Sequence, residues 1–308
     1  MGELRYNIEL IVANILFGIS FSVYVSLLQG GVMPSQLFVL QLLFSMVVST
    51  PLAVLQLDFI RLSLNDFGSI FIVAILVVFG WWYLLIEGAA KTNPIDASTI
   101  TTIGPLFTFI ASIVAHSRRA KWGERIGILV ALLGVTVLLF DRGYSIVESG
   151  DVGYGNTLVL CAVVAIAINT IMITPTLHRH RTLIIMGWYY LIGTLLALPM
   201  IVEVLPTMHN LELTLENKID ICYILLFGSV LPMYLLYNGS KHLTATHTAI
   251  YRYIQPIVAA IVAVARGQSV IDRTNIVGAV LIFSGILCVI IATPRQERIA
   301  NLEGVTRE

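Results

Sequence analysis

Residues 83–88 read Tyr-Leu-Leu-Ile-Glu-Gly, and residues 234–239, which follow 151 positions later, read Tyr-Leu-Leu-Tyr-Asn-Gly. The same offset continues without a gap through three further matches: Pro105 with Pro256, Gly127 with Gly278, and Gly134 with Gly285. Residues 83–134 hold five glycines and residues 234–285 hold four, and three of them coincide where chance gives fewer than one. The chain therefore contains a sequence repeat, although the match fades before Tyr83.

The repeat is embedded in a very apolar chain. Apolar residues make up 57% of the 308 residues, only 12% are charged, and the mean hydropathy is +0.90, whereas soluble proteins carry about 25% charged residues. A membrane-crossing helix needs about 20 mainly apolar residues. Ten stretches meet this length: 8–28, 34–56, 66–88, 94–116, 123–141, 153–177, 183–203, 216–238, 245–265 and 273–292. The alternating pattern of a β-barrel is absent, so we expect an all-α polytopic membrane protein with ten transmembrane helices.

Each half of the chain then holds five of the expected spans. We expect a first five-helix repeat over residues 1–141, a second over residues 153–292, and a cytoplasmic tail over residues 293–308. Because five is an odd number, the second repeat enters the membrane upside down relative to the first. Inverted repeats of this kind are typical of carriers that work by alternating access, with the substrate site between the halves.

The positive charges predict the orientation, because lysine and arginine are enriched in cytoplasmic loops. Both termini and the even-numbered turns share one side, which holds twelve of the eighteen Lys and Arg residues. The other side holds five, and Arg252 lies within a span. We therefore expect both termini in the cytoplasm. Residues 178–181 (His-Arg-His-Arg) fit a cytoplasmic turn better than a metal or nucleotide site.

Several function classes find no support in the sequence. Eighteen basic and eighteen acidic residues cancel, so no basic field points to nucleic acid. A zinc-binding His-Glu-x-x-His helix, a phosphate-binding glycine loop and a pair of aspartates within a span are all absent, so we expect neither enzyme activity, nor a metal, nor a cofactor. The cysteines Cys161, Cys222 and Cys288 lie in apolar runs without a Cys-x-x-Cys spacing, which indicates small core residues.

Several motifs resemble those of EamA-like members of the drug/metabolite transporter superfamily. The motifs are Phe17-Gly18-Ile19-Ser20 in the first span, Ala97 to Pro105 leading into Gly127 and Gly134, and their echo in Thr248, Pro256, Gly278 and Gly285. The resemblance covers essentially the whole chain. It implies ten helices in two inverted five-helix repeats and, mostly, efflux of amino acids or other metabolites. Gln41 differs from the arginine that such proteins often have in the second span.

Arg252 is the most costly polar residue in the expected spans, because a charge within the bilayer must be matched by a partner. Thr248, Tyr251, Arg252 and Gln255 share one face of the ninth span, and Pro256 frees a backbone carbonyl beside them. We expect Arg252 to face a central cavity and bind a carboxylate or phosphate of the substrate, with contacts from Tyr251 and Gln255. The alternative is that Arg252 pairs with a carbonyl near Pro256 or extends to the cytoplasmic surface.

Other polar or aromatic residues within the spans are candidates for lining the same cavity: Tyr83, Glu87, Thr101, Tyr234, Asn238, Asn14 and Asn169. Thr101 fits a substrate contact and a hydrogen bond to its own backbone equally well. Glu87 is the only acid that we expect on an inward face, where it would couple transport to protons. It also fits simple contact with water at the external end of its span.

Five further aromatic residues are typical of anchors at the membrane surface rather than of ligand contacts. They are Trp81, Trp82, Trp188, Tyr189 and Tyr190.

These observations favour a transporter that moves a small metabolite, such as an amino acid, by alternating access, with export from a bacterial cytoplasmic (inner) membrane implied by the resemblance. An organellar carrier of nucleotide sugars or sugar phosphates and a flippase for lipid-linked sugars remain open, as does an integral membrane enzyme. The expected partners are a small-molecule substrate and the lipid bilayer, not nucleic acid, and the protein is a monomer or a homodimer.

Overall fold

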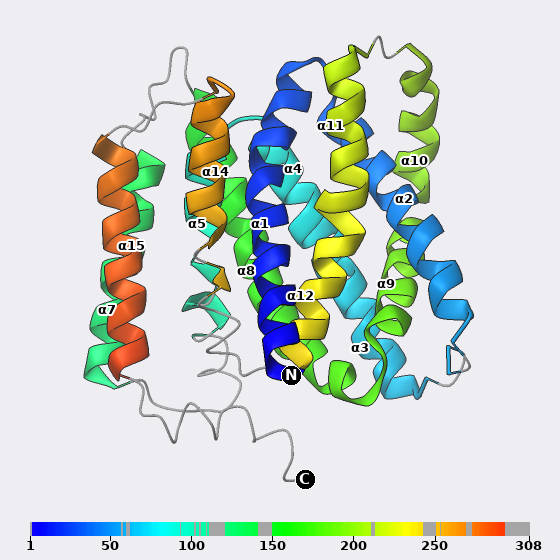
Figure 1. The fold of residues 1–308 in the computed structure, drawn as a ribbon, viewed down its shortest axis with the longest axis horizontal. Coiled ribbons are helices and arrows are strands. Elements are labelled where there is room, and N and C mark those ends of the chain that lie inside the picture. Colours follow the sequence, from blue (N-terminus) through cyan, green and yellow to red (C-terminus); the bar gives the residue numbers. More distant parts are fainter. Residues whose placement is uncertain are drawn as a thin grey trace.

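The computed structural model describes residues 2–56, 58–59, 62–92, 94–101, 103–104, 106–108, 110, 121–140, 150–210, 213–242, 251–252, 254–268 and 273–292 (Figure 1). Its described elements are all helices, so the expected all-α class is confirmed. In chain order they are α1 (Gly2–Gln29), α2 (Pro34–Val54), α3 (Leu64–Ala74), η1 (Ile75–Tyr83), α4 (Leu84–Ala89), α5 (Pro94–Thr101), α7 (Trp122–Phe140), α8 (Gly150–Arg179), α9 (Thr182–Leu196), α10 (Leu198–Val204), η2 (Leu205–Asn210), α11 (Leu215–Leu225), η3 (Leu226–Val230), α12 (Leu231–His242), α14 (Ile254–Ala265) and α15 (Arg273–Ala292). The elements η1 and η3 are π-helical and η2 is a 3₁₀-helix.

Five described helices are long and apolar enough to cross a membrane: Leu4–Gln29, Pro34–Val54, Leu64–Ala89, Val152–Arg179 and Leu215–Lys241. A sixth arises if Thr182–Leu196 and Leu198–His209, which meet at 65°, form one bent span. These six correspond to the expected spans 1, 2, 3, 6, 7 and 8. The fourth and ninth spans are interrupted in the described residues, so the count of ten stays a prediction.

Two helix starts recur at the repeat offset. The Ser63 hydroxyl accepts a hydrogen bond from the backbone N–H of Asp66 at 3.1 Å, and the Thr214 hydroxyl accepts one from Asn217 at 3.1 Å. Such side chains start helices because they pair an otherwise free N–H of the first turn. Ser63 and Thr214 are 151 positions apart, and so are their hydrogen-bond partners Asp66 and Asn217. The equivalence between the halves therefore extends about 20 residues upstream of the sequence match.

The two π-helical segments also occupy matching places. The segment η1 begins at Ile75 and η3 begins at Leu226, again 151 positions apart. Each one interrupts a span that is otherwise α-helical. π-helical turns are rare and often lie at functional sites. Their recurrence at equivalent positions therefore indicates that this part of the third and eighth spans has a functional role.

The helices α7 and α15 pack closely against each other at one side of the bundle (Figure 1). A β-carbon on Gly134 would stand 2.8 Å from the carbonyl oxygen of Gly278, and one on Gly285 would stand 2.5 Å from that of Gly127. Gly127 and Gly278 are matched in the repeat, and so are Gly134 and Gly285. The first contact therefore becomes the second when each glycine is replaced by its match in the other half. Reciprocal contacts of this kind are what a twofold relation between two helices produces.

The other packing contacts recur in the same way. The helix α4 packs on α8, and α12 packs on α1, so the third span meets the sixth as the eighth meets the first. The helix α2 packs on α9, its counterpart. Figure 1 shows α3 beginning at the end of the bundle where the N-terminus lies, whereas α11 begins at the opposite end.

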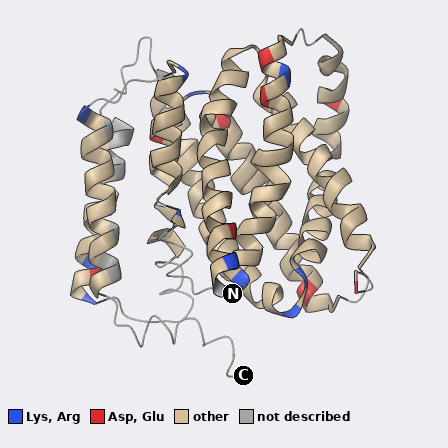
Figure 2. Ribbon diagram, in the orientation of Figure 1, with Lys and Arg blue, Asp and Glu red and all other residues tan. Residues whose placement is uncertain are grey.

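Charged residues gather near the two ends of the helices, and apolar residues cover the sides between them (Figure 2). Exposed apolar side chains such as Val47, Leu129 and Ile261 lie along this outer surface. Cys161, Cys222 and Cys288 are exposed there as well. The prediction that the cysteines are core residues is therefore wrong: in a bundle surrounded by lipid, an apolar run supplies the outer surface as well as the core.

Candidate functional site

The fourth and ninth spans are both interrupted, close to matching residues: the described turn residues are Ile103 in the fourth span and Arg252 in the ninth. The helix α5 ends at Thr101, and Arg252 lies in a turn just before α14. Pro256 has no N–H, so the carbonyl of Arg252 lacks its usual partner and instead accepts from Gln255 N at 3.1 Å. The helices α5 and α14 pack against each other and against α1. Broken helices at such a crossing provide the irregular backbone from which carriers build substrate sites.

Three of the predicted site residues meet in one buried polar cluster. The Gln255 amide nitrogen donates to the Asn14 side-chain oxygen at 2.6 Å, and the Asn14 nitrogen donates to the carbonyl of Leu10 at 2.7 Å. The Thr101 hydroxyl donates its one proton to the carbonyl of Ser98 at 2.7 Å, the backbone hydrogen bond that the sequence left open, and lies 3.4 Å from the Gln255 oxygen. All three side chains are buried, so the cluster joins α1, α5 and α14 at the level of the interruptions.

Arg252 lies against the same crossing. Its Nη1 atom is 3.1 Å from the point that a β-carbon on Gly104 would occupy, so the guanidinium fills the space that the glycine leaves. No ion pair joins Arg252 to any residue that the structure describes. Tyr237 lies close enough to interact with its charge, and the Asn169 nitrogen donates to the Tyr237 hydroxyl at 3.1 Å. Thr248, which was expected to share this face, lies outside the described residues.

Tyr251 and Asn238 lie at the N-terminal end of α1. The Tyr251 hydroxyl donates to Asn7 Oδ1 at 3.0 Å. The Asn238 nitrogen donates to Glu9 Oε2 at 2.7 Å, and Glu9 also pairs with Arg5 at 3.0 Å. Both residues therefore hold the start of α1 in place.

Tyr83, Glu87 and Tyr234 are half-buried. Tyr83 packs edge-on against Phe38, with 5.4 Å between the ring centroids, and Glu87 lies beside Tyr83. No contact among the described residues links these three to Arg252. The expectation that Glu87 is the only inward-facing acid is wrong, because Glu9, Asp96 and Asp220 are more deeply buried. All three stand near the ends of the expected spans 8–28, 94–116 and 216–238.

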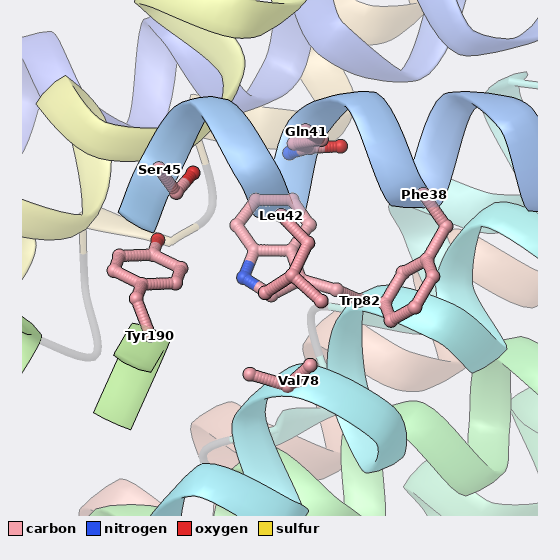
Figure 3. A pocket seen from close by; sticks show the side chains of 7 residues that line it. All are labelled: Phe38, Gln41, Leu42, Ser45, Val78, Trp82 and Tyr190. Atoms are coloured by element: carbon pink, nitrogen blue, oxygen red, sulfur yellow. The ribbon is translucent and has the colours of Figure 1, made fainter. Parts of the chain in front are cut away.

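A small pocket lies between α2, η1 and α9 (Figure 3). It has room for roughly one water molecule. It is lined by Phe38, Gln41, Leu42, Ser45, Val78, Trp82 and Tyr190. Gln41 is held by Tyr24, whose hydroxyl lies 2.9 Å from the Gln41 amide nitrogen. None of these residues was among the predicted site residues.

The interpretation of the aromatic residues as membrane-surface anchors is wrong for Trp81, Trp82, Tyr189 and Tyr190, which are all more than nine-tenths buried inside the bundle. Trp188 is half-buried, donates to the carbonyl of Phe59 at 2.9 Å and stacks on its ring at 4.8 Å. The position of Tyr189 and Tyr190, in the middle of the expected span 183–203, was the signal that could have corrected this.

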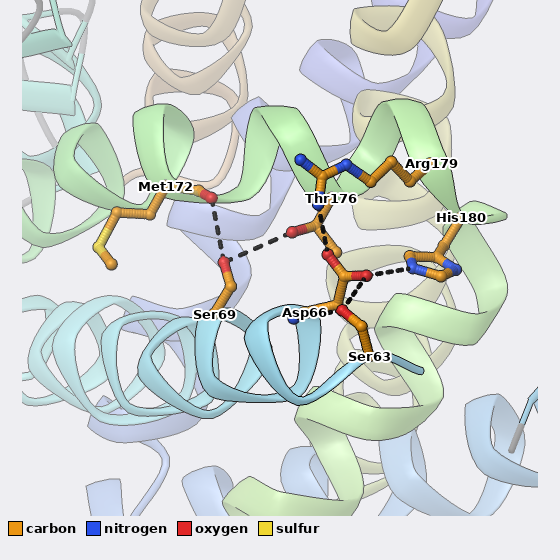
Figure 4. A network of polar contacts seen from close by, with 7 residues as sticks. All are labelled: Ser63, Asp66, Ser69, Met172, Thr176, Arg179 and His180. Atoms are coloured by element: carbon orange, nitrogen blue, oxygen red, sulfur yellow. Dashed lines mark hydrogen bonds and ion pairs between the residues drawn. The ribbon is translucent and has the colours of Figure 1, made fainter. Parts of the chain in front are cut away.

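Polar networks tie helices together at the two ends of the bundle. At one end Asp66 accepts from Arg179 at 3.0 Å and lies 3.0 Å from His180 Nε2, which connects the start of α3 to the end of α8 (Figure 4). At the other end Asp220 of α11 binds Arg266 through two hydrogen bonds of 2.8 and 2.9 Å. The hydrogen bonds from Arg266 to Asp220 raise the pKa of that guanidinium further.

Comparison with known proteins agrees with this architecture. The model of the EamA-like transporter family matches residues 5–140 and again residues 153–291, so the domain is duplicated. Two relatives from Bacillus subtilis (strain 168) are named Uncharacterized transporter YetK, 25% identical over 82% of this chain and 74% of the relative, and Uncharacterized transporter YyaM, 22% identical over 71% and 72%. A solved structure described as "Crystal structure of protein" shares the fold, with a TM-score of 0.63, 16% identity, and coverage of 94% of this chain and 98% of the other.

Proposed function

The chain belongs to the EamA-like transporter family and is a membrane transporter, and on this premise we propose that it exports a small organic anion or zwitterion, such as an amino acid, across a bacterial cytoplasmic membrane by alternating access. Both termini are cytoplasmic in this proposal. The substrate site lies where the interrupted fourth and ninth spans cross.

One observation carries the proposal: Arg252 stands in the interruption of the ninth span without an ion-pair partner among the described residues. An arginine at the centre of a membrane helix costs about 2.5–3.5 kcal/mol on insertion scales, and arginine stays protonated. A carboxylate or phosphate of the substrate would offset this cost. The space left by Gly104 gives the guanidinium room beside the backbone just after α5.

The remaining predicted residues have supporting roles in this proposal. Gln255, Asn14 and Thr101 hold the three helices that meet at the crossing, and Asn169 orients Tyr237 beside Arg252. Tyr251 and Asn238 act at the cytoplasmic mouth, where they bind α1. Tyr83, Tyr234 and Glu87 line the opposite part of the path.

Alternating access needs two halves that can exchange roles. Helix caps, π-helical turns, interrupted spans and glycine contacts that all recur at one offset support a pair of inverted five-helix repeats. The networks around Asp66 and Asp220 connect helices at opposite ends of the bundle, so each is suited to open while the other stays closed.

Thermal-shift screening of the purified protein against organic anions and zwitterions, followed by flux measurements in proteoliposomes, tests the proposal. We expect carboxylate- or phosphate-bearing solutes both to stabilise the protein and to be transported. Stabilisation and flux limited to cations or neutral sugars would contradict the proposed substrate class.

A further inference from the structure

Three hydrogen-bonding atoms end in the small pocket without a partner. The side chains of Ser45, Trp82 and Tyr190 are more than nine-tenths buried, and Ser45 Oγ, Trp82 Nε1 and the Tyr190 hydroxyl make no hydrogen bond to any described residue. They lie near one another, but no pair reaches the geometry of a hydrogen bond. Figure 3 shows the three atoms turned toward the same end of the pocket. Such atoms are costly to bury unpaired, so the pocket is suited to a partner that enters it.

Trp82 decides the chemistry of that partner. An indole N–H can only donate, whereas serine and tyrosine hydroxyls can donate or accept. A group that pairs with all three must therefore present an acceptor. No acid is among the seven lining residues, so nothing in the pocket would neutralise a cation. The room for roughly one water molecule fits a single carbonyl, hydroxyl or carboxylate oxygen.

The fold does not require an indole N–H at the equivalent position of the other half. Trp82 lies in the π-helical segment η1, and the residue at the repeat offset is Met233, which offers no N–H. Met233 is equally buried, so the position itself accepts a fully apolar side chain. An indole at this position therefore adds polarity that packing does not require.

A row of tyrosines connects the pocket to Arg252. The Tyr190 and Tyr189 rings have centroids 4.3 Å apart, and Tyr189 meets Tyr237 edge-on at 6.4 Å. Tyr237 in turn is within electrostatic range of Arg252. The tyrosines therefore extend from the pocket toward the guanidinium.

We propose that the pocket formed by Ser45, Trp82 and Tyr190 is a second subsite, which receives an acceptor oxygen at the far end of the solute whose anion binds Arg252. The inference rests on the proposed function and narrows its substrate class to organic anions or zwitterions that carry a second, oxygen-bearing group. Solutes with an apolar or cationic far end bind more weakly.

Matched probes isolate the acceptor oxygen. Hexanoate and 5-oxohexanoate differ by one ketone oxygen, and 2-aminohexanoate and 2-amino-5-oxohexanoate form the same pair with an amino group. Apparent affinities come from thermal-shift titrations of the purified full chain. We expect the oxo member of a pair to bind roughly 10-fold more tightly, the effect of one to two net hydrogen bonds.

Two variants and a matched control test whether the preference for the oxo probes depends on Trp82 and Tyr190. Trp82→Phe removes the N–H and keeps an aromatic ring, and Tyr190→Phe removes the hydroxyl alone. Trp188→Phe makes the same change as Trp82→Phe at an indole that is already bonded to Phe59. We expect the preference to disappear in the first two variants and to persist in the control. Without probe, the melting temperature of Tyr190→Phe should not fall, because the hydroxyl that it removes makes no hydrogen bond to any described residue; Trp82→Phe should lose some stability through the smaller ring alone.

The outcomes separate the subsite from the anion site. Equal affinities within each pair in the wild type, including no stabilisation by any probe, would overturn the subsite. So would a preference that survives Trp82→Phe, or a lowered melting temperature of Tyr190→Phe without probe, which would indicate a structural water only. If Arg252→Gln leaves all affinities unchanged while Trp82→Phe removes the preference, the proposed anion site fails and the subsite stands.

Discussion

Thr101 and Arg252 hold the same place in the two halves of the chain, 151 positions apart, each at the interruption of its helix. One is neutral and donates to the carbonyl of Ser98, and the other is charged and has no ion-pair partner among the described residues. The two halves thus supply a similar backbone feature with different chemistry. In the proposed mechanism, this asymmetry places the anion on Arg252.

Arg252→Gln should therefore abolish flux of anionic and zwitterionic solutes while leaving expression and monodispersity intact. Arg252 is half-buried and has no ion-pair partner among the described residues, so its replacement leaves no described acid without its partner. Proteoliposome flux and size-exclusion profiles measure the two effects. Arg273→Gln, a change at an exposed arginine, is the control and should transport normally. Unchanged flux in folded Arg252→Gln would retire the anion site, and loss of folding would favour a structural arginine.

Glu87→Gln should remove any dependence of transport on a pH gradient, because Glu87 is the acid proposed to line the path. The measurement is flux with and without an imposed gradient, compared with Glu203→Gln, which alters an exposed acid. Gradient dependence that persists in Glu87→Gln would shift the role to one of the more deeply buried acids, such as Glu9 or Asp96. If the wild type shows no gradient dependence, the protein is a facilitator.

Gly134→Ala should destabilise the α7–α15 pair. The added methyl group would meet the backbone oxygen of Gly278 at 2.8 Å and Ile282 Cγ1 at 2.8 Å, and backbone cannot move away cheaply. We expect a loss of roughly 1–3 kcal/mol, as for other overpacked sites, seen as a lower melting temperature. Gly68→Ala makes the same change where nothing lies within 4 Å, and it should be neutral or slightly stabilising.

Asp66→Asn should weaken the network at the start of α3. The change removes the charge that binds Arg179 and His180. Because Arg179 is 62% exposed, we expect the free energy of unfolding to fall by only about 1–2 kcal/mol. Thermal unfolding measures it. Arg179→Gln removes only the exposed partner and should cost less. Equal melting temperatures for wild type and Asp66→Asn would show that the network contributes no stability.

Reporter fusions test the orientation. A reporter after Glu308 and one inserted between Asn210 and Leu215 should report opposite sides of the membrane, with Glu308 in the cytoplasm. This outcome follows from the excess of Lys and Arg on one side of the expected spans. Reports from the same side at both positions would contradict the ten-span arrangement.

The sequence predicted the helical class and the duplication, because apolar runs and glycine spacing carry those signals directly. It predicted Asn14, Thr101 and Gln255 as cavity-lining residues, but not the buried cluster in which the structure brings them together. The matching caps at Ser63 and Thr214 escaped the alignment because serine and threonine start helices equally well and so need not be identical. The pocket escaped it because Trp82 and Tyr190 have the residue types of membrane-surface anchors. Only packing distinguishes a membrane-surface anchor from a pocket residue, because the sequence of a span does not reveal which neighbouring helix its aromatic face contacts.

The π-helical turns at Ile75–Tyr83 and Leu226–Val230 have a mechanical consequence. Each such turn closes its hydrogen bonds over one residue more than an α-helical turn, and one residue of α-helix corresponds to about 100° of rotation and about 1.5 Å of rise. Tightening the first turn to α-helical geometry would swivel the segment that follows, with Trp82 and Tyr83 at its edge, about its own axis without bending the helix. The matched turn in the other half would do the same for the segment of Tyr234. Each half thus contains a joint at which a change from π-helical to α-helical geometry would re-aim aromatic side chains, by rotating one part of the helix relative to the other.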